Sequence, residues 1–404
     1  MAFFPRQRAG SVSGSKPMSS ESLFSGVFSS MRSHAGPTVN QNTALNLPAV
    51  YCAVGIIADA LAMLPFDVLQ NVNGKKQKVS DHPISDLLNH SPNPYMSAMT
   101  LRQTQMFHAL LWGNGYQEIE RNGAGQPVSI WPLMPDATKP VKKPTEDRLY
   151  YQTSIAGQGF NIEKDDVLHI PAMGYDGYVG YSPVSVCRNA IGLGLATEEY
   201  GSKFFANDAK SGGFLQHPGK LSDTAQKNIM DGVEKKSGLD NAHRIKILEE
   251  GMKFVSTTIP PEDAQFLGTR EFQIAEIARI YRVPLVLLQS MEKATSWGSG
   301  IESMMLGFIG WTLSPWIIKT EQEINRKMFT ESEREKGFYC KMNLNAIMRA
   351  DMAARAAFYK EGILNGYMTR NEVREKEDWN PIEGLDKPLI PLNMTPDGEK
   401  TDEE

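Results

Sequence analysis

The hydrophobic positions of this chain recur with two different spacings, which indicates a mixture of helices and strands. Residues 47–64 have the apolar spacing of a buried helix, with Pro48 in its first turn and Pro65 directly after it. Residues 66–70 then alternate like a strand toward a turn at Asn73 and Gly74. The first elements therefore predict a helix that leads into a hairpin.

The rest of the first half continues this mixture. A short helix is predicted at 82–89, and Thr100 with Gln103 forms a capping box for another helix that ends at 113–115. The glycine-rich turn at 122–125 predicts a hairpin between the strands on either side of it. Strands are predicted at 116–121, 127–133, 149–153 and 167–170. The fold class predicted from these elements is α+β.

The second half is mostly helical. Ser182 is an N-cap candidate for a helix that Pro183 opens and that runs to about residue 206, and residues 214–216 form a brief strand. Amphipathic helices are predicted at 222–236 and 261–281, with two short strands between them at 243–248 and 253–258. An alanine-rich helix at 345–362 and a helix capped by Thr369 and Glu372 follow.

The most specific pattern is the polar, glycine-bearing loop at 290–300, which opens directly into a long apolar helix. Ser299 and Glu302 form a capping box, so this helix should begin at about Gly300 and continue toward residue 328. Pro315 lies inside it and leaves the carbonyl of Trp311 without its partner, which predicts a kink at 311–314. On spacing alone, an ordinary core helix after a surface loop is the favoured interpretation.

Composition and charge narrow the class of protein. The 404 residues carry a formal net charge of −5, which argues against a protein that grips nucleic acid by bulk electrostatics. The longest apolar runs are interrupted by charged residues and proline, so no membrane span is expected. Residues 1–39 are rich in serine and glycine and are predicted to be a disordered arm, and residues 386–404 a flexible acidic tail.

No catalytic constellation stands out. The three cysteines and seven histidines have no metal-ligand spacing, and no phosphate-binding glycine motif occurs, so neither metal nor cofactor is expected. The carboxylate pairs at 165–166 and 249–250 are weak candidates for general acid–base catalysis, because adjacent side chains of a strand face opposite ways. The chain is therefore expected not to be an enzyme, with a hydrolase that uses these carboxylates as the alternative.

Five motifs occur in an order that resembles the HK97-like family of bacteriophage portal proteins, over about residues 47–381. They are Tyr181-Ser182-Pro183 with the helix after it, the run at 204–211, the run at 261–265, Ile277-Ala278-Arg279 with Val283-Pro284, and the run at 295–302.

The resemblance implies a division of the chain into the parts of a portal subunit. The order is the disordered arm at 1–39, the wing at 40–220, the first stem helix at 221–238, the clip at 239–260, the second stem helix at 261–283, the tunnel loop with the kinked helix and the return to the wing at 284–344, a short helical crown at 345–385 and the tail at 386–404.

The resemblance also implies site residues. The tunnel loop facing DNA would comprise Ser290, Glu292, Lys293, Thr295, Ser296, Trp297 and Ser299. The helix hinge would lie at Trp311 and Pro315. The clip surface facing the packaging motor would comprise His243, Arg244, Lys246, Glu249, Glu250 and Lys253.

The function implied is that of a ring, dodecameric in the family, at one capsid vertex, through which double-stranded DNA is packaged and later leaves. The implied partners are further copies of the chain, double-stranded DNA held transiently and without sequence preference, the terminase large subunit, head–tail adaptor proteins, and the major capsid and scaffold proteins. Residues 263–328 include equal numbers of acidic and basic residues. Such a balance suits a channel in which DNA must slide, because tight contacts to its phosphates would hold it. Another ring-forming virion adaptor is the second alternative.

Overall fold

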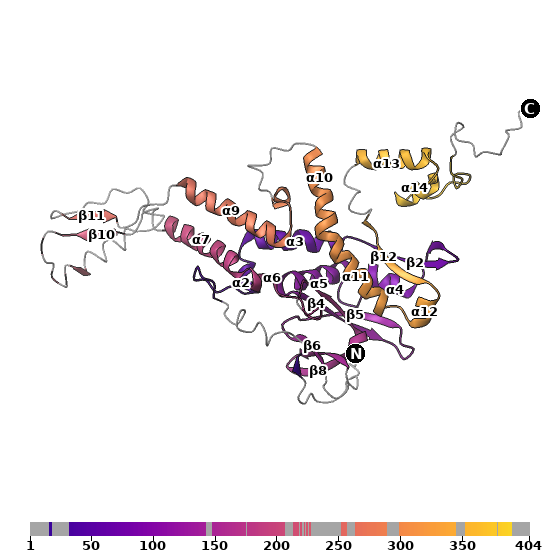
Figure 1. Ribbon diagram of the computed structural model, residues 1–404, viewed down its shortest axis with the longest axis horizontal. Helices are drawn as coiled ribbons and strands as arrows, with labels where there is room; N and C mark the ends of the chain where they lie inside the picture. The colour runs from indigo at the N-terminus through magenta and orange to yellow at the C-terminus, as the bar shows by residue number, and fades with distance from the viewer. Residues whose placement is uncertain are drawn as a thin grey trace, which may run out of the picture. The chain divides into compact units, whose positions relative to one another are not determined.

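The computed structural model divides the chain into two units, Met1–Ala62 with Phe66–Lys341 and Met63–Pro65 with Met342–Glu404. The residues that it describes are 16–17, 32–142, 148–174, 176–206, 213–217, 219, 222, 224, 226–227, 252–256, 263–288, 299–344, 352–377 and 379–389. Figure 1 shows helices and antiparallel sheets in the first unit and helices in the second. The predicted α+β class is confirmed.

The centre of the first unit is an antiparallel three-stranded sheet in the order β5-β4-β9. Its strands are β4 (Asn114–Arg121), β5 (Pro127–Leu133) and β9 (Val167–Pro171), so the predicted hairpin is confirmed. Helix α5 (Ala98–Trp112) packs on β4, and α3 (Pro48–Ala62) packs on α5. Ser97 caps α5 by accepting a hydrogen bond from the amide of Thr100, so the capping box predicted at Thr100 is wrong and the helix begins earlier.

Two glycines make the passage from α5 to β4 possible. Gly113 ends α5 with φ of 85°, a left-handed conformation that favours glycine. A Cβ on Gly115 would lie 2.4 Å from the backbone oxygen of Gln105, so the strand and the helix touch through their backbones. The close fit of α5 on the sheet therefore depends on the absence of a side chain at residue 115.

A second sheet covers the other face of this one. It has the order β1-β6-β7-β8, with β1 (Lys16–Pro17), β6 (Thr138–Lys142), β7 (Leu149–Ile155) and β8 (Gln158–Glu163). Both sheets contribute to one buried apolar cluster formed by Tyr116, Leu133, Tyr151, Ile162 and Val167. The core of the first unit thus consists of a helical layer and two sheets, and the central strand β4 is buried on both faces.

A buried polar network links the two sheets. The side-chain amide of Asn114 donates to the backbone oxygen of Gly180 and its oxygen accepts from the Gly180 amide, both at 2.8 Å. The same oxygen lies 2.9 Å from Nε2 of His169, which must therefore be the protonated nitrogen. Nδ1 of His169 then accepts from the hydroxyl of Tyr151 at 3.1 Å. These contacts keep His169 in one neutral tautomer.

A third sheet has the order β12-β2-β3. Its strands are β2 (Phe66–Val72), β3 (Lys75–Lys78) and β12 (Phe338–Met342). In the chain, α4 (Pro83–Asn89) follows β3, and α12 (Glu331–Glu335) precedes β12. The predicted turn is confirmed, with φ of 53° at Asn73 and 81° at Gly74. The edge strand β3 has the sequence Lys-Lys-Gln-Lys and is exposed throughout.

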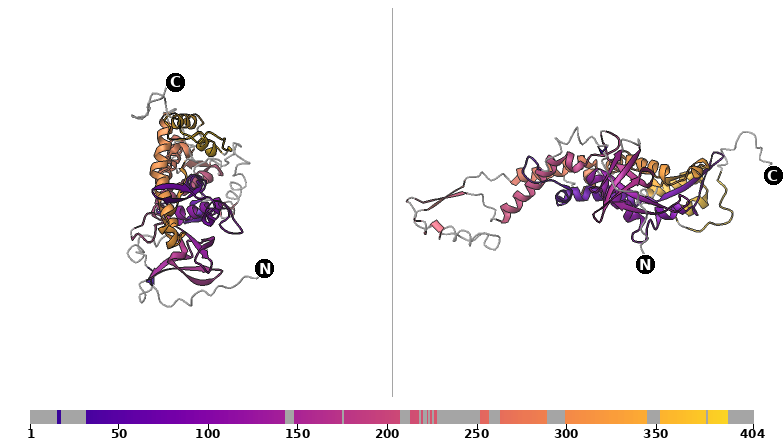
Figure 2. Two further views of the ribbon diagram at one scale, coloured as in Figure 1. Left: turned by 90° about the vertical axis from the view of Figure 1, so that its right-hand side faces the viewer. Right: turned by 90° about the horizontal axis from the view of Figure 1, so that it is seen from below.

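Two long helices lie side by side in the first unit, as the views in Figures 1 and 2 agree. They are α7 (Arg188–Ala206) and α9 (Asp263–Tyr281). Before α7 come α2 (Gln41–Ala44) and the short α6 (Pro183–Val186), where Ser182 is the N-cap as predicted. The helix predicted over 183–206 is interrupted at Cys187, which has φ of −99° and ψ of 21°.

Two strands between α7 and α9 lie within the described residues, and they pair with each other. β10 (Gly213–Gln216) and β11 (Lys253–Ser256) form an antiparallel pair with Gln216 opposite Lys253. The sequence left 214–216 as a separate strand, because nothing in its local pattern identifies a partner some 40 residues away. The strand predicted at 243–248 as a partner of 253–258 lies outside the described residues, as does most of the helix predicted at 222–236, so both stay predictions.

The long helix after the polar loop consists of three segments: α10 (Ser299–Phe308), the π-helical turn η4 (Ile309–Leu313) and α11 (Ser314–Lys327). In the second unit, α13 (Met352–Leu364) is followed by α14 (Arg370–Lys376). Thr369 and Glu372 form the predicted capping box of α14.

The two glycines near the ends of β4 provide a matched test of the packing of α5. Gly115→Ala places a Cβ against the backbone of Gln105, and we expect it to lower the free energy of unfolding by about 2 kcal/mol or more. Gly123→Ala meets no atom within 4 Å and should change it by less than about 0.5 kcal/mol. Urea denaturation followed by circular dichroism measures both; equal effects would contradict the close packing.

The buried network predicts a pH dependence of stability. Burial, with Lys327, Lys319 and Arg326 nearby, lowers the pKa of His169 to about 3 from an ordinary 6.5. Between these two pKa values the unfolded chain binds a proton at His169 and the folded chain does not. The free energy of unfolding should therefore fall as the pH falls, by at most about 1.4 kcal/mol per pH unit. In denaturation experiments between pH 7 and 4, His169→Gln should have a lower free energy of unfolding than the wild type at pH 7. The difference between the two should shrink as the pH falls, because only the wild type loses stability through His169. The exposed His34→Gln should follow the wild type, and a constant gap for His169→Gln would refute the assignment.

Candidate functional site

The candidate site is the joint in the long helix, where the missing amide of Pro315 is accommodated by a π-helical turn. The turn covers Ile309–Leu313, is separated from Pro315 by Ser314, and overlaps the segment 311–314 where the sequence predicts a kink. The amide of Ser314 donates to the oxygen of Ile309, five residues back, and the Ser314 hydroxyl donates to the same oxygen at 2.8 Å. Pro315 therefore stands in the first turn of a new α-helical segment, where its lack of an N–H is tolerated.

The π-helical turn is tied to the end of α9 by one hydrogen bond. The hydroxyl of Thr312 donates to the backbone oxygen of Arg282 at 2.7 Å. Arg282 has φ of 56°, a conformation uncommon for a residue with a side chain. Its amide donates to the oxygen of Arg279, and the amide of Val283 donates to the oxygen of Ala278, which together close α9 as a Schellman motif.

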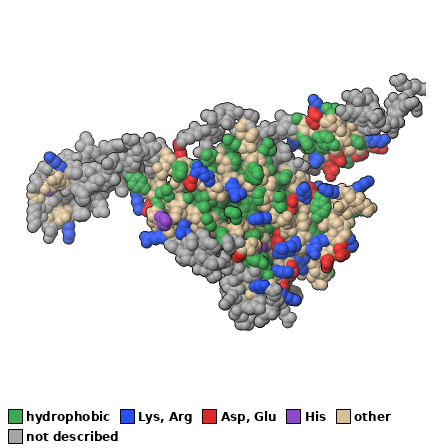
Figure 3. Space-filling model, viewed as in Figure 1, with side chains coloured by type: hydrophobic (Ala, Val, Ile, Leu, Met, Phe, Trp, Pro, Cys, Tyr) green, Lys and Arg blue, Asp and Glu red, His purple; other side chains and the backbone are tan. Residues whose placement is uncertain are grey.

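An apolar groove of about 400 Å³ lies between the end of α9 and the joint. Ala278, Val283, Met304 and Phe308 are among the side chains that line it, and the ring of Trp311 is 80 % exposed at its border. Figure 3 shows hydrophobic side chains gathered on this face around α9 and α10. Exposed tryptophan residues such as Trp311 are enriched at interaction sites.

Beyond the joint, α11 is held to the central sheet by buried charged groups. The ammonium of Lys327 lies 2.5 Å from the carboxylate of Glu323 and also donates to the backbone oxygen of Val167 in β9. Glu323 accepts from the amide of His169 at 3.2 Å. Burial lowers the pKa of Lys327, and Glu323 opposes this effect. Because removal of one partner would leave a buried charge alone, these contacts fix α11 firmly on β9.

Two further contacts attach α11 along its length. Lys319 donates to the backbone oxygen of Pro171 at 2.8 Å, and burial lowers the pKa of its ammonium. At the other end, Arg121 donates to the backbone oxygen of Lys327 at 2.6 Å. The helix is therefore anchored to β9 on the far side of the joint from α10.

The sequence-predicted residues occupy the following places. Trp311 lies in the π-helical turn. Pro315 is the second residue of α11 and is exposed. Lys253 is exposed at the start of β11, and Ser299 is the first residue of α10. The remaining predicted tunnel-loop and clip residues lie outside the described part of the chain, namely Ser290, Glu292, Lys293, Thr295, Ser296, Trp297, His243, Arg244, Lys246, Glu249 and Glu250.

The described residues give little support to the catalytic alternative. Asp166 forms an ion pair with Arg121 at 2.7 Å, and the backbone oxygen of Asp165 accepts from the same guanidinium. Within the described ranges no group of three His, Cys, Asp or Glu side chains could hold a metal ion. No helix described in either unit has the length and apolar character needed to span a membrane.

Sequence reasoning missed the anchoring residues. The spacing of Glu323 and Lys327 is that of an ordinary exposed helical ion pair, yet both side chains are buried. Thr312 and Arg282 are 30 residues apart and carry no motif that connects them. The one available signal was the position of Thr312 and Thr320 on the apolar face of the helix, where a polar residue needs a hydrogen-bond partner.

Comparison with known proteins relates this architecture to one family. The family model described as phage portal protein matches residues 48–378. The portal protein of Enterobacteria phage HK97 is 32 % identical over 363 residues, which is 89 % of this chain and 85 % of the phage protein.

Solved structures agree on the fold. The crystal structure of an HK97 family phage portal protein from Corynebacterium diphtheriae matches with a TM-score of 0.57 at 14 % identity, over 76 % of this chain and 96 % of that one. A chain from the neck of a native GTA particle, computed with C12 symmetry, matches with a TM-score of 0.54 at 20 % identity, over 89 % of this chain and 99 % of that one. The chain therefore belongs to the phage portal protein family.

Proposed function

We propose that this chain forms a ring, dodecameric in the particle, at one vertex of a capsid, and that double-stranded DNA enters and leaves through its channel. The observation that carries the proposal is the family match over residues 48–378. The related neck structure with C12 symmetry supports the subunit number. A head–tail adaptor is disfavoured, because this chain aligns with 85 % of the length of a portal protein.

The division into parts also remains a proposal, with one refinement. Residues 40–220 would be the wing, 239–260 the clip and 345–385 the crown, while the tunnel loop would precede α10. Helix α9 packs on both α3 and α7, and the strands β10 and β11 fall between α7 and α9 in the sequence. We therefore infer that α7 pairs with α9 in the stem, in addition to or in place of the first stem helix predicted at 221–238.

The jointed helix suits a channel component. Its α11 segment is fixed on β9 by Lys327 and Lys319, whereas α10 is separated from it by a π-helical turn and follows the polar loop directly. A π-helical turn is a common feature of functional sites. We infer that Trp311 and Pro315 form a hinge that lets the loop move against DNA while the wing stays in place.

The partners follow from this role. DNA would contact the loop residues around Lys293 transiently and without sequence preference. The terminase large subunit, and later the head–tail adaptors, would meet the clip, including the exposed Lys253. The major capsid and scaffold proteins would contact the wing.

Assembly provides the direct test of the ring. We expect the purified chain to give a closed ring of about a dozen copies by native mass spectrometry, because a ring-forming contact joins two different surfaces of the subunit and closes by rotation. Electron microscopy of the same sample should show a central channel. A protein that stays a monomer or dimer at high concentration would count decisively against the proposal.

The loop contact has its own test. Lys293→Ala combined with Glu292→Ala removes the charged pair of the tunnel loop, and we expect lower DNA packaging or poorer retention of packaged DNA, with ring assembly unchanged. The amount of DNA protected from nuclease in assembled particles measures this. Lys76→Ala, on the exposed edge strand β3, is the matched control. Packaging and retention equal to the wild type would mean that the loop makes no functional contact with DNA.

A further inference from the structure

Four asparagines of this chain are followed directly by glycine, and the structure holds them in different ways. They are Asn73, Asn114, Asn122 and Asn365. An asparagine before glycine is prone to lose its side-chain amide, because a residue without a Cβ lets its backbone nitrogen approach the preceding side chain. The proposed channel function makes no use of these pairs.

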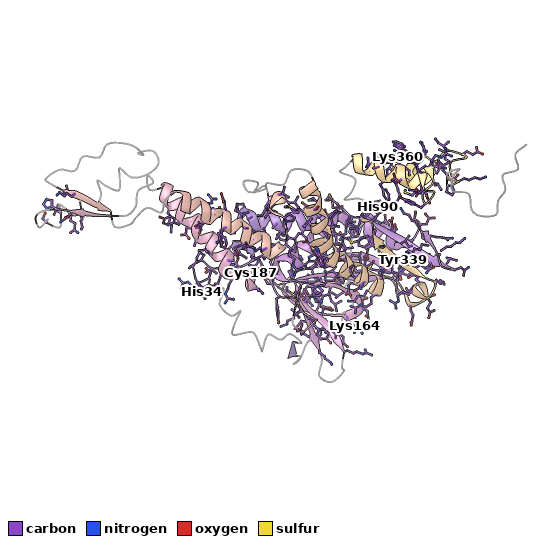
Figure 4. The ribbon with its side chains drawn as sticks, turned by 45° about the horizontal axis from the view of Figure 1, so that its top comes forward. His34, His90, Lys164, Cys187, Tyr339 and Lys360 are labelled. Atoms are coloured by element: carbon purple, nitrogen blue, oxygen red, sulfur yellow. The ribbon has the colours of Figure 1, made fainter. Side chains whose placement is uncertain are left out.

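Asn73 lies in the exposed turn between β2 and β3, with φ of 53°. Tyr339 of β12, labelled in Figure 4, belongs to the same sheet, in which β3 is an edge strand. Within the described residues, neither the Asn73 side chain nor the amide of Gly74 forms a hydrogen bond. A Cβ on Gly74 would meet no atom within 4 Å. This turn can therefore change its conformation without disturbing the rest of the unit.

Asn122 is exposed like Asn73, but its side chain is held by hydrogen bonds. An added Cβ on Gly123 would also meet no atom within 4 Å, so the space around the two turns is alike. The side-chain oxygen of Asn122 accepts from the amides of Ala124 and Gln126, both at 3.0 Å. Its side-chain nitrogen donates to Oε1 of Gln126 at 3.1 Å. These bonds must open before the side chain can turn toward the nitrogen of Gly123.

The other two pairs are held as well. Asn114 is buried, and its side-chain nitrogen and oxygen are both hydrogen-bonded in the network that links the two sheets. Asn365 donates through its side-chain nitrogen to Oε2 of Glu361 at 3.0 Å. The amide of Gly366 donates to the backbone oxygen of Ile363 at 3.3 Å, so the nitrogen that would attack Asn365 is already engaged.

The charge around the turn at Asn73 also favours the reaction. The reaction begins when the backbone nitrogen of the glycine loses its proton, and a nearby positive charge stabilises the anion that forms. Lys75 and Lys76 directly follow Gly74 and are exposed. At the other exposed turn, the neighbouring Arg121 is paired with Asp166 at 2.7 Å.

We propose that Asn73 is a deamidation site of this protein and reacts fastest of the four Asn–Gly pairs in the folded chain. The nitrogen of Gly74 forms a bond to the side-chain carbonyl carbon of Asn73 and gives up its proton, and the side-chain nitrogen leaves as ammonia. Water then opens the resulting succinimide ring at either carbonyl carbon, which gives aspartate or isoaspartate. The product adds a negative charge to the tip of the lysine-rich hairpin. As isoaspartate it also adds a backbone carbon to the turn.

Peptide mapping of the incubated full chain tests the choice of site. In mildly alkaline buffer made with heavy-oxygen water, each deamidation takes up one labelled oxygen, which mass spectrometry of the proteolytic peptides locates. We expect Asn73 to react at least about ten-fold faster than Asn122, because the hydrogen bonds of Asn122 keep its reactive population small. In concentrated urea the two rates should come within about three-fold of each other, because unfolding removes the difference.

Two kinds of variant serve as controls. Asn73→Gln should abolish the label in its peptide, because the longer side chain closes a ring far more slowly, and should leave Asn122 unchanged. Lys75→Gln combined with Lys76→Gln should slow the reaction at Asn73 and not at Asn122, because it removes the positive charge beside Gly74.

Two results would overturn the proposal. The first is deamidation of Asn73 that is no faster than that of Asn122 in the folded chain. The second is a ratio of the two rates that is the same in urea as in the folded chain, because the local sequence and not the structure would then select the site. Neither measurement requires ring assembly, so the proposed function and this inference can fail separately.

Discussion

Proline has no amide hydrogen, and the consequences of that fact at position 315 organise the long helix of this protein. A regular helix would leave the carbonyl of Trp311 without a partner and would force the proline ring against the preceding turn. The chain instead widens to a π-helical turn over Ile309–Leu313, and the oxygen of Ile309 receives both the amide and the hydroxyl of Ser314. The irregularity is therefore stabilised by hydrogen bonds rather than merely tolerated.

The two ends of this helix are held in different ways. On the far side of the π-helical turn, Lys327 and Glu323 form a buried pair against β9, which is costly to disturb because each charge needs the other. On the near side, the hydrogen bond from Thr312 to Arg282 connects the turn to the end of α9. Portal proteins are structural components of the virion. In this chain the buried charges of Lys327 and Glu323 hold α11 on β9.

Local signals were sufficient for many elements of the fold. The positive φ values that Asn73 and Gly74 adopt, and the capping box of Thr369 and Glu372, follow from the chemistry of neighbouring residues. At α5 the capping box predicted at Thr100 was wrong, because Ser97 caps the helix three residues earlier. The pairing of β10 with β11 and the contact of Lys327 with β9 join distant segments, so no local pattern could reveal them. The same holds for the candidate site: the proline indicated where the helix is irregular, but its anchors depend on tertiary contacts.

The exposed edge strand β3 affects how two identical chains can meet. A sheet edge presents unpaired amides and carbonyls to any other strand, and identical chains at high local concentration are the readiest partners. Three of the four residues of β3 are lysines, so two such edges repel one another before their backbones can pair. The positive charge of this strand therefore opposes edge-to-edge pairing of two copies of the chain.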